Sequence, residues 1–196
     1  MGVEEHESFP HWNYFLALEE DLDRLSRFVE FTTDNYECYS IELARVLMLA
    51  SAEIDVVAKQ LCDHIASNST ANGINEYRTI ILSAYLSFPT STVSIPRHGL
   101  ALRPWSNWSD GENPTWWRDH NNVKHNRHMH FAEANLKNAL NAVGALLLMI
   151  IYLYAPAARA GKLAPNPRLY QVGEPIVVDR LFWGERTNTY AIPTDG

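Results

Sequence analysis

The sequence predicts an all-α protein built as an antiparallel bundle of four to five helices, and three observations support this prediction. Apolar residues recur every three or four positions through several long segments, whereas strand-like alternation is confined to short stretches. The predicted order of helix, long helix, helix, hairpin-like insertion, short helix, long apolar helix and tail favours antiparallel neighbouring helices. The 196 residues are 46% hydrophobic and 20% charged, so the chain can bury one core without a second domain.

The first three predicted helices are amphipathic. The first, residues 12–31, carries an apolar stripe of Phe15, Leu18, Leu22, Leu25 and Phe28. The second, residues 39–65, continues the spacing through Leu43, Leu47, Ala50, Ile54, Val57, Leu61 and Ile65. A loop follows at residues 67–73, and a third helix at 74–88 ends before Pro89. Because the second helix is the longest of the three, we expect it to support much of the core.

A hairpin-like insertion is predicted at about residues 89–113, between helices. Val93 and Ile95 alternate with polar neighbours, as do Leu100 and Leu102, and the sequence PRHG between them favours a turn. Four tryptophans gather in and after this insertion, at positions 105, 108, 116 and 117. We expect them to pack this long loop onto the core, in preference to an exposed surface that stacks on bases.

The second half of the chain adds two helices and a tail. Asn113 followed by Pro114 predicts a capped helix start, with the helix at 115–126, and a last long helix is predicted at 130–154. Alternation within 173–183 suggests a short strand in a tail rich in proline and glycine. The predicted organisation is therefore a helical domain at 1–165 and a C-terminal tail at 166–196.

One apolar run, AVGALLLMIIYLYA at 142–155, resembles a membrane span. It has about fourteen residues, whereas a bilayer requires about twenty, so a buried central helix and no membrane association are expected. The acidic N-terminus lacks a secretory pattern, and Cys38 and Cys62 form no CxxC or zinc pattern. These features favour a reducing cytoplasm.

The most informative chemistry lies in WWRDHNNVKHNRHMHF, residues 116–131. The net charge of −7 leaves no broad basic face for long nucleic acid, so any such contact must be local. This block nevertheless holds four of the eight histidines, two arginines and a lysine against the single Asp119. Arg118 and His125 are seven residues apart, two turns along one helix face. The block is therefore attractive to a phosphate.

The string RDHNNVKH resembles the signature of the HEPN family of small helical proteins, an arginine and a polar residue followed at a short spacing by a histidine. Arg118 matches the arginine, Asp119 the polar residue and His125 the histidine. The helix order over about residues 12–155 is also similar. The resemblance implies a bundle of four or five helices that dimerises, and in many members a metal-independent ribonuclease; other members only bind nucleotides or partners.

What the resemblance implies for the site is an endoribonuclease of the defence or toxin type. His125 would move the proton of a 2′-hydroxyl that attacks the adjacent phosphate, and Arg118 would stabilise the charge on the phosphate oxygens. No metal or cofactor is expected, and the expected partners are RNA or a nucleotide, a second copy of the chain, and a protein partner or antitoxin. The remaining predicted site residues bind phosphate or RNA (Asn121, Lys124 and Arg127) or support the site (Asp119 and Asn122).

Several alternatives stay open on the sequence alone. The chain could be a catalytically silent interaction or regulatory domain that binds a protein or nucleotide partner, for instance through the Trp-rich loop. His125 could be a structural histidine at a helix junction, and histidines 120, 125, 128 and 130 could bind a metal. Glu53 and Asp55 could face the basic block as charge partners or lie in solvent. Serine-hydrolase, cysteine-protease and P-loop motifs are not found.

Overall fold

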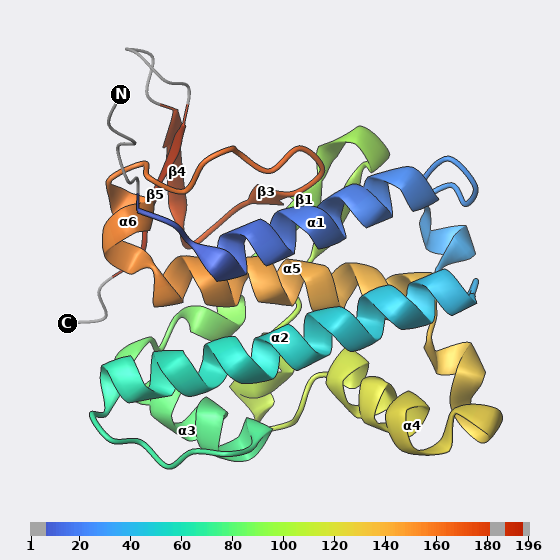
Figure 1. The fold of residues 1–196 in the computed structure, drawn as a ribbon, viewed down its shortest axis with the longest axis horizontal. Coiled ribbons are helices and arrows are strands. Elements are labelled where there is room, and N and C mark those ends of the chain that lie inside the picture. Colours follow the sequence, from blue (N-terminus) through green and yellow to red (C-terminus); the bar gives the residue numbers. More distant parts are fainter. Residues whose placement is uncertain (1–6, 181–186, 194–196) are drawn as a thin grey trace, which may run out of the picture.

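The computed structural model describes residues 7–180 and 187–193, and within them the chain is mostly helical, as predicted (Figure 1). Six α-helices alternate with 3₁₀ turns and short strands. The helices are α1 (Pro10–Leu25), α2 (Ile41–Ile65), α3 (Ile74–Ala84), α4 (Thr115–His130), α5 (Leu136–Leu153) and α6 (Ala155–Arg159). The strands are β1 (Val93–Ile95), β2 (Leu100–Leu102), β3 (Gln171–Val172), β4 (Val177–Arg180) and β5 (Asn188–Ala191).

Helix α5 is the centre of the fold. Helix α2 packs along it, and α1 and α4 also pack against it (Figure 1). This position explains the apolar sequence of α5 from residue 142 onward, because a helix contacted from several sides needs no polar face. Within the described residues, α5 alone is long and apolar enough to cross a membrane, and 89% of that segment is buried inside the protein. The expected buried central helix is therefore found.

The ends of the first helix differ from the prediction. Helix α1 ends at Leu25 and not at residue 31, and the side chain of Phe28, assigned to the apolar stripe, is 84% exposed. Ser26 is the C-cap residue of α1, and its hydroxyl donates to the Asp23 carbonyl at 2.7 Å. Helix α2 begins close to the predicted residue, since the Ser40 hydroxyl accepts from the Leu43 N–H at 3.1 Å.

The predicted hairpin is present, and it recruits a third strand. Strands β1 and β2 pair antiparallel, and β3 from the tail pairs with the other edge of β1, giving the order β2-β1-β3. The sheet lies close to α5 at Gly144, where an added Cβ would be 2.8 Å from Cγ2 of Val93. The strand predicted within 173–183 is confirmed over residues 177–180, as β4 paired with β5, whereas 173–176 form a turn and 181–186 lie outside the described residues.

The tail is fastened to α1 by a buried carboxylate. Glu19 is 3% exposed, and its two oxygens accept the backbone N–H groups of Arg168, Leu169 and Tyr170 at 3.0, 2.8 and 3.0 Å. The indole N–H of Trp12, also on α1, donates to the Pro165 carbonyl at 3.1 Å. The tail therefore belongs to the same packed unit as the helices.

The four clustered tryptophans are packed in the core, as predicted. Their exposed fractions do not exceed 9%. Ring centroids are 4.4 Å apart for Trp105 and Trp108, and 5.2 Å apart for Trp105 and Trp116. The indole N–H of Trp105 donates to the Ala145 carbonyl of α5 at 3.2 Å. Because these rings are buried, they offer no surface on which a base or a partner protein could stack.

Candidate functional site

Helix α4 carries the basic block and presents two different faces. Trp116, Trp117, His120 and Val123 are buried on one side, and α4 contacts α5 and α2. Arg118, Lys124 and His125 are exposed. The helix starts where predicted, but Asn113 does not cap it: Pro114 occupies the N-cap position, and the Asn113 side-chain oxygen accepts from Arg78 at 3.5 Å.

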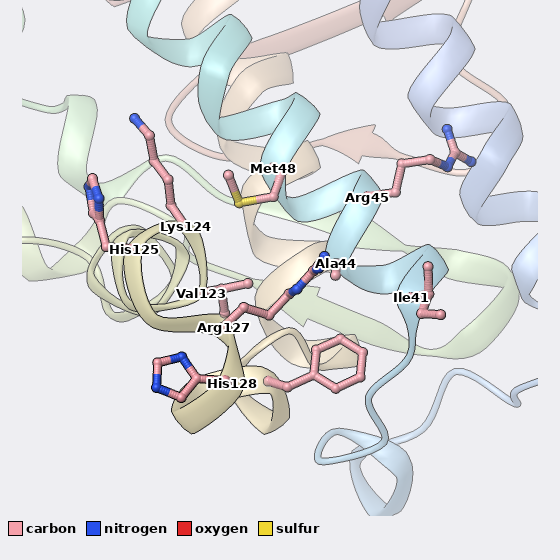
Figure 2. A pocket seen from close by; sticks show the side chains of 10 residues that line it. Ile41, Ala44, Arg45, Met48, Val123, Lys124, His125, Arg127 and His128 are labelled. Atoms are coloured by element: carbon pink, nitrogen blue, oxygen red, sulfur yellow. The ribbon is translucent and has the colours of Figure 1, made fainter.

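Helix α4 is interrupted at Asn126, the predicted end of this helix. Its backbone angles, φ −139° and ψ 46°, are not helical, so the following turn does not continue the helical face of Arg118 and His125. Figure 2 shows the side chain of Arg127 extending from α4 toward Ala44 on α2, whereas His125 and Lys124 lie on the preceding turns. The break therefore redirects Arg127 across the space between the two helices.

The two helices enclose a groove of about 870 Å³, here called the α2–α4 groove (Figure 2). Its lining contains five basic or titratable side chains and five apolar ones, and no carboxylate. The lining residues are Ile41, Ala44, Arg45, Met48, Val123, Lys124, His125, Arg127, His128 and Phe131.

The cations of this groove differ in whether they are neutralised. Arg45 pairs with Asp21 at 2.9 Å and with Glu42 at 2.8 Å, whereas Lys124 and Arg127 form no ion pair within the described residues. Figure 2 agrees, because the Arg45 guanidinium points away from α4 toward α1. The free positive charge of the groove therefore comes from α4.

The structure brings together some of the predicted site residues and leaves one apart. Lys124, His125 and Arg127 line the same groove. Arg118 does not line it; this side chain is exposed two turns earlier on α4, about 10 Å along the helix axis from His125. Within one chain, the two motif residues therefore lie along one helix without converging at a single point.

Asn121, Asn122 and Asp119 are engaged in bonds within the protein. The Asn121 amide donates to the Trp117 carbonyl at 3.0 Å, and the Asn122 amide donates to Glu133 at 2.8 Å. Asp119 accepts from the Asn138 amide at 2.7 Å. Burial raises the pKa of Asp119, and neighbouring Glu133 raises it further, while the Asn138 hydrogen bond and the Arg118 and Lys137 charges act in the opposite direction. Asp119 and Asn122 therefore connect α4 to α5 and to the turn that precedes it, whereas the Asn121 bond lies within α4.

The four histidines of the block have separate surroundings. His120 is buried with Nδ1 3.1 Å from the Trp117 carbonyl oxygen, and burial lowers its pKa. His130 Nδ1 lies 2.6 Å from Glu133 Oε1. His125 and His128 line the groove. No group of three His, Cys, Asp or Glu side chains suited to a metal ion occurs in the described part of the chain.

The carboxylates considered as charge partners of the block have other partners. Glu53 pairs with His11 of α1. Asp55 accepts from Tyr77 at 2.7 Å and from Lys59 at 2.6 Å, and it contributes only a weak electrostatic effect at His120. Neither Glu53 nor Asp55 lines the α2–α4 groove. The basic block is thus not neutralised from the middle of α2.

Sequence reasoning missed the α2 wall of the groove. Met48 and Arg45 lie about eighty residues before His125 in the chain, and their spacing reads only as part of an amphipathic helix. Ile41 is 73% exposed, and the sequence alone does not predict this exposure for an apolar residue at the start of a helix. These residues become part of the groove only because α2 and α4 pack together in the fold.

Comparison with known proteins adds no family to this description. No family model matches the chain. No curated protein and no solved structure is significantly similar to it. The function must therefore be argued from the groove itself.

Proposed function

We propose that this chain is a metal-independent endoribonuclease of the HEPN type that holds single-stranded RNA in the α2–α4 groove. The observation that carries the proposal is the lining of that groove: Lys124, Arg127 and two histidines are among the residues that line a space of about 870 Å³, and no carboxylate is among them. In a chain of net charge −7, such a local excess of positive charge requires a reason, and a phosphate backbone supplies one.

The mixed lining of the groove favours single-stranded RNA over a duplex. A duplex presents mainly phosphates and sugars, whereas unpaired RNA exposes base faces that pack on apolar and aromatic side chains. Met48, Val123 and Phe131 provide apolar surface next to the cations. Phe131 is also supported from outside by Tyr39, with ring centroids 5.4 Å apart. A base on this surface would bring its phosphate to the α4 cations.

The proposed chemistry uses His125 and the neighbouring cations. Neutral His125 takes the proton of the 2′-hydroxyl, the 2′-oxygen attacks phosphorus, and the bond from phosphorus to the 5′-oxygen breaks. The leaving 5′-oxygen needs a proton, and His125 returns the one that it took from the 2′-hydroxyl. Lys124 and Arg127 stabilise the charge on the phosphate oxygens. The products are a 2′,3′-cyclic phosphate and a free 5′-hydroxyl.

Arg118 enters the proposal through a second copy of the chain. It is exposed and forms no ion pair within the described residues, so it is free to contact an anion outside its own chain. A dimer that pairs the α4 helices would place one Arg118 beside the His125 of the other chain. The homodimer is thus part of the proposal, and an antitoxin partner would act by covering the same face.

A second candidate function, a catalytically silent interaction domain, is favoured by one observation. Apolar side chains near the groove are unusually exposed: Ile41 is 73% exposed, and Met129, on the turn that carries His128, is 74% exposed. Such residues are typical of protein interfaces. Any such partner would bind at this surface and not through the buried Trp105, Trp108 and Trp116.

The test is an RNA cleavage assay with a chelator present. The purified protein is incubated with a mixture of single-stranded and structured RNA, and the product ends are identified. We expect cleavage of single-stranded segments with cyclic phosphate ends, at least a hundredfold loss in His125→Ala, and a similar loss in Arg118→Ala. His64→Ala, an exposed histidine at the end of α2, is the matched control and should retain full activity.

Two outcomes would contradict the nuclease proposal. Activity that disappears with the chelator would overturn the metal-free mechanism. RNA that is bound in the groove but remains intact under all conditions would leave the interaction domain as the function. Sedimentation analysis of the same samples tests the proposed dimer. An active enzyme that is strictly monomeric would contradict it.

A further inference from the structure

A second basic hollow lies on the small sheet, apart from the α2–α4 groove. It has a volume of about 510 Å³ and is here called the sheet pocket. Its walls come from β1, β2, the start of α5 and the turn that contains Tyr36. None of its lining residues is shared with the groove.

The pocket exists because the outward face of the hairpin carries small side chains. Val93 and Leu102 pair across the strands and are buried against the core, so the next pair, Ser94 and Ala101, faces outward. Beside them, Gly173 follows β3, and a Cβ at this position would be 2.5 Å from the Thr92 hydroxyl. Ser94, Ala101 and Gly173, which lie in or next to adjacent strands, are small and leave room for a ligand.

Two cations from different elements line the pocket. Arg103 follows β2, and Lys137 lies in the first turn of α5. Neither forms an ion pair within the described residues, and no carboxylate lines the pocket. By contrast, several exposed cations elsewhere are paired, including Arg24, Arg97 and Lys162. Two unpaired cations at one hollow match a dianion.

The remaining lining suits a phosphate that carries an organic group. The hydroxyls of Ser94 and Ser106 and the amide of Asn141 add polar contacts beside the cations. The ring of Tyr36 adds apolar surface. A pocket of about 510 Å³ falls within the range that holds a small ligand with mixed polar and apolar contacts.

We infer that the sheet pocket binds a nucleoside monophosphate, with Arg103 and Lys137 on the phosphate and Tyr36 against the base. A phosphate monoester carries nearly two negative charges at neutral pH, whereas a carboxylate carries one. Two cations therefore favour the phosphate monoester as the ligand. The inference does not require that RNA be cleaved, because its residues are distinct from those of the α2–α4 groove.

The test is calorimetric titration of the full chain with AMP, with inorganic phosphate and with adenosine. We expect saturable one-to-one binding of AMP, weaker binding of phosphate and none of adenosine. Arg103→Gln and Lys137→Gln should each weaken AMP binding by about tenfold or more. Both side chains are exposed, so these variants should fold, and thermal unfolding curves check this directly.

Matched variants separate this pocket from other basic surfaces. Lys162→Gln, an exposed lysine beyond α6 at the opposite end of α5, should bind AMP as the wild type does. Lys124→Gln removes a cation of the α2–α4 groove and tests whether AMP binds there instead. If Lys124→Gln weakens binding and Arg103→Gln does not, AMP occupies the groove and the inference is wrong. Absence of saturable AMP binding, or equal affinity for phosphate and AMP, would also overturn it.

Discussion

Glu19 and His120 are buried ionisable side chains with different surroundings. The carboxylate of Glu19 is surrounded by three backbone donors from the tail, so its charge is hydrogen-bonded where it lies. His120 is buried beside Trp117, with ring centroids 5.0 Å apart, and burial lowers its pKa. Glu19 therefore stabilises the fold by accepting backbone N–H groups, whereas burial favours the neutral form of His120.

Replacing Glu19 with Gln should lower the free energy of unfolding by about 2 kcal/mol or more. The amide keeps the volume, but it loses the charge and turns an N–H group toward backbone donors. Chemical denaturation measures the loss. The adjacent Glu20→Gln is the control, because Glu20 forms only an exposed pair with Arg24 and should change stability by less than about 0.5 kcal/mol. Equal losses in the two variants would contradict the role assigned to Glu19.

His120 predicts a loss of stability in mild acid. The unfolded chain takes up a proton at this residue as the pH falls below about 6.5, whereas the folded chain, with its lowered pKa, does so only at lower pH. The unfolded state is therefore favoured as the pH falls through this window, and above about pH 6.5 the effect is absent. Thermal unfolding of the wild type should lose more stability than His120→Gln between about pH 7.5 and about pH 5.5. If the stability of the wild type and of His120→Gln changes equally with pH, His120 is not the cause of the loss in acid.

At the scale of elements, the start of α5 depends on its cap. Asn135 accepts the Asn138 N–H at 3.0 Å, and its amide donates to Glu37 at 3.3 Å. Asn135→Ala should destabilise the protein by about 1–2 kcal/mol in a denaturation experiment. Asn141→Ala, nearly two turns further along the helix, removes an exposed bond to the Lys137 carbonyl and should cost little stability. A larger loss in Asn141→Ala would show that the cap is not the critical contact.

The elements that periodicity predicts well are those that bury one face. Helix α2 and the β1–β2 hairpin were placed closely, because their apolar spacing reflects direct contact with the core. The end of α1 was wrong, since the spacing that includes Phe28 continues past the last hydrogen-bonded turn. Strand β3 was missed because two residues, Gln171 and Val172, carry no detectable alternation. Its pairing depends on a strand about eighty residues earlier.

The site was predictable in part for the same physical reason. Local composition identified the α4 side of the groove, including Lys124, His125 and Arg127, since these residues are close in the chain. The α2 side and the separation of Arg118 from the groove depend on how two helices cross and on the break at Asn126. The sheet pocket was not predicted, because Arg103 and Lys137 come together only through the fold.

At the scale of the whole molecule, an acidic protein with a local basic groove should bind RNA with a modest salt dependence. If about three cations contact phosphates, the slope of log affinity against log salt concentration should be about −2 for single strands. Lys124→Gln should reduce its magnitude by about 0.7, and Lys162→Gln should not change it. Fluorescence anisotropy with labelled RNA at several salt concentrations measures these slopes. A slope that is unaffected by Lys124→Gln would place the RNA elsewhere.

The packed tryptophans give the molecule a built-in optical signal. Indoles as close as Trp105 and Trp108 couple electronically, so the near-ultraviolet circular dichroism should be strong in the folded state and vanish when the cluster separates. Trp117 lies beside His120, and a protonated imidazole quenches indole emission. The emission of Trp117 should therefore decrease when His120 takes up a proton.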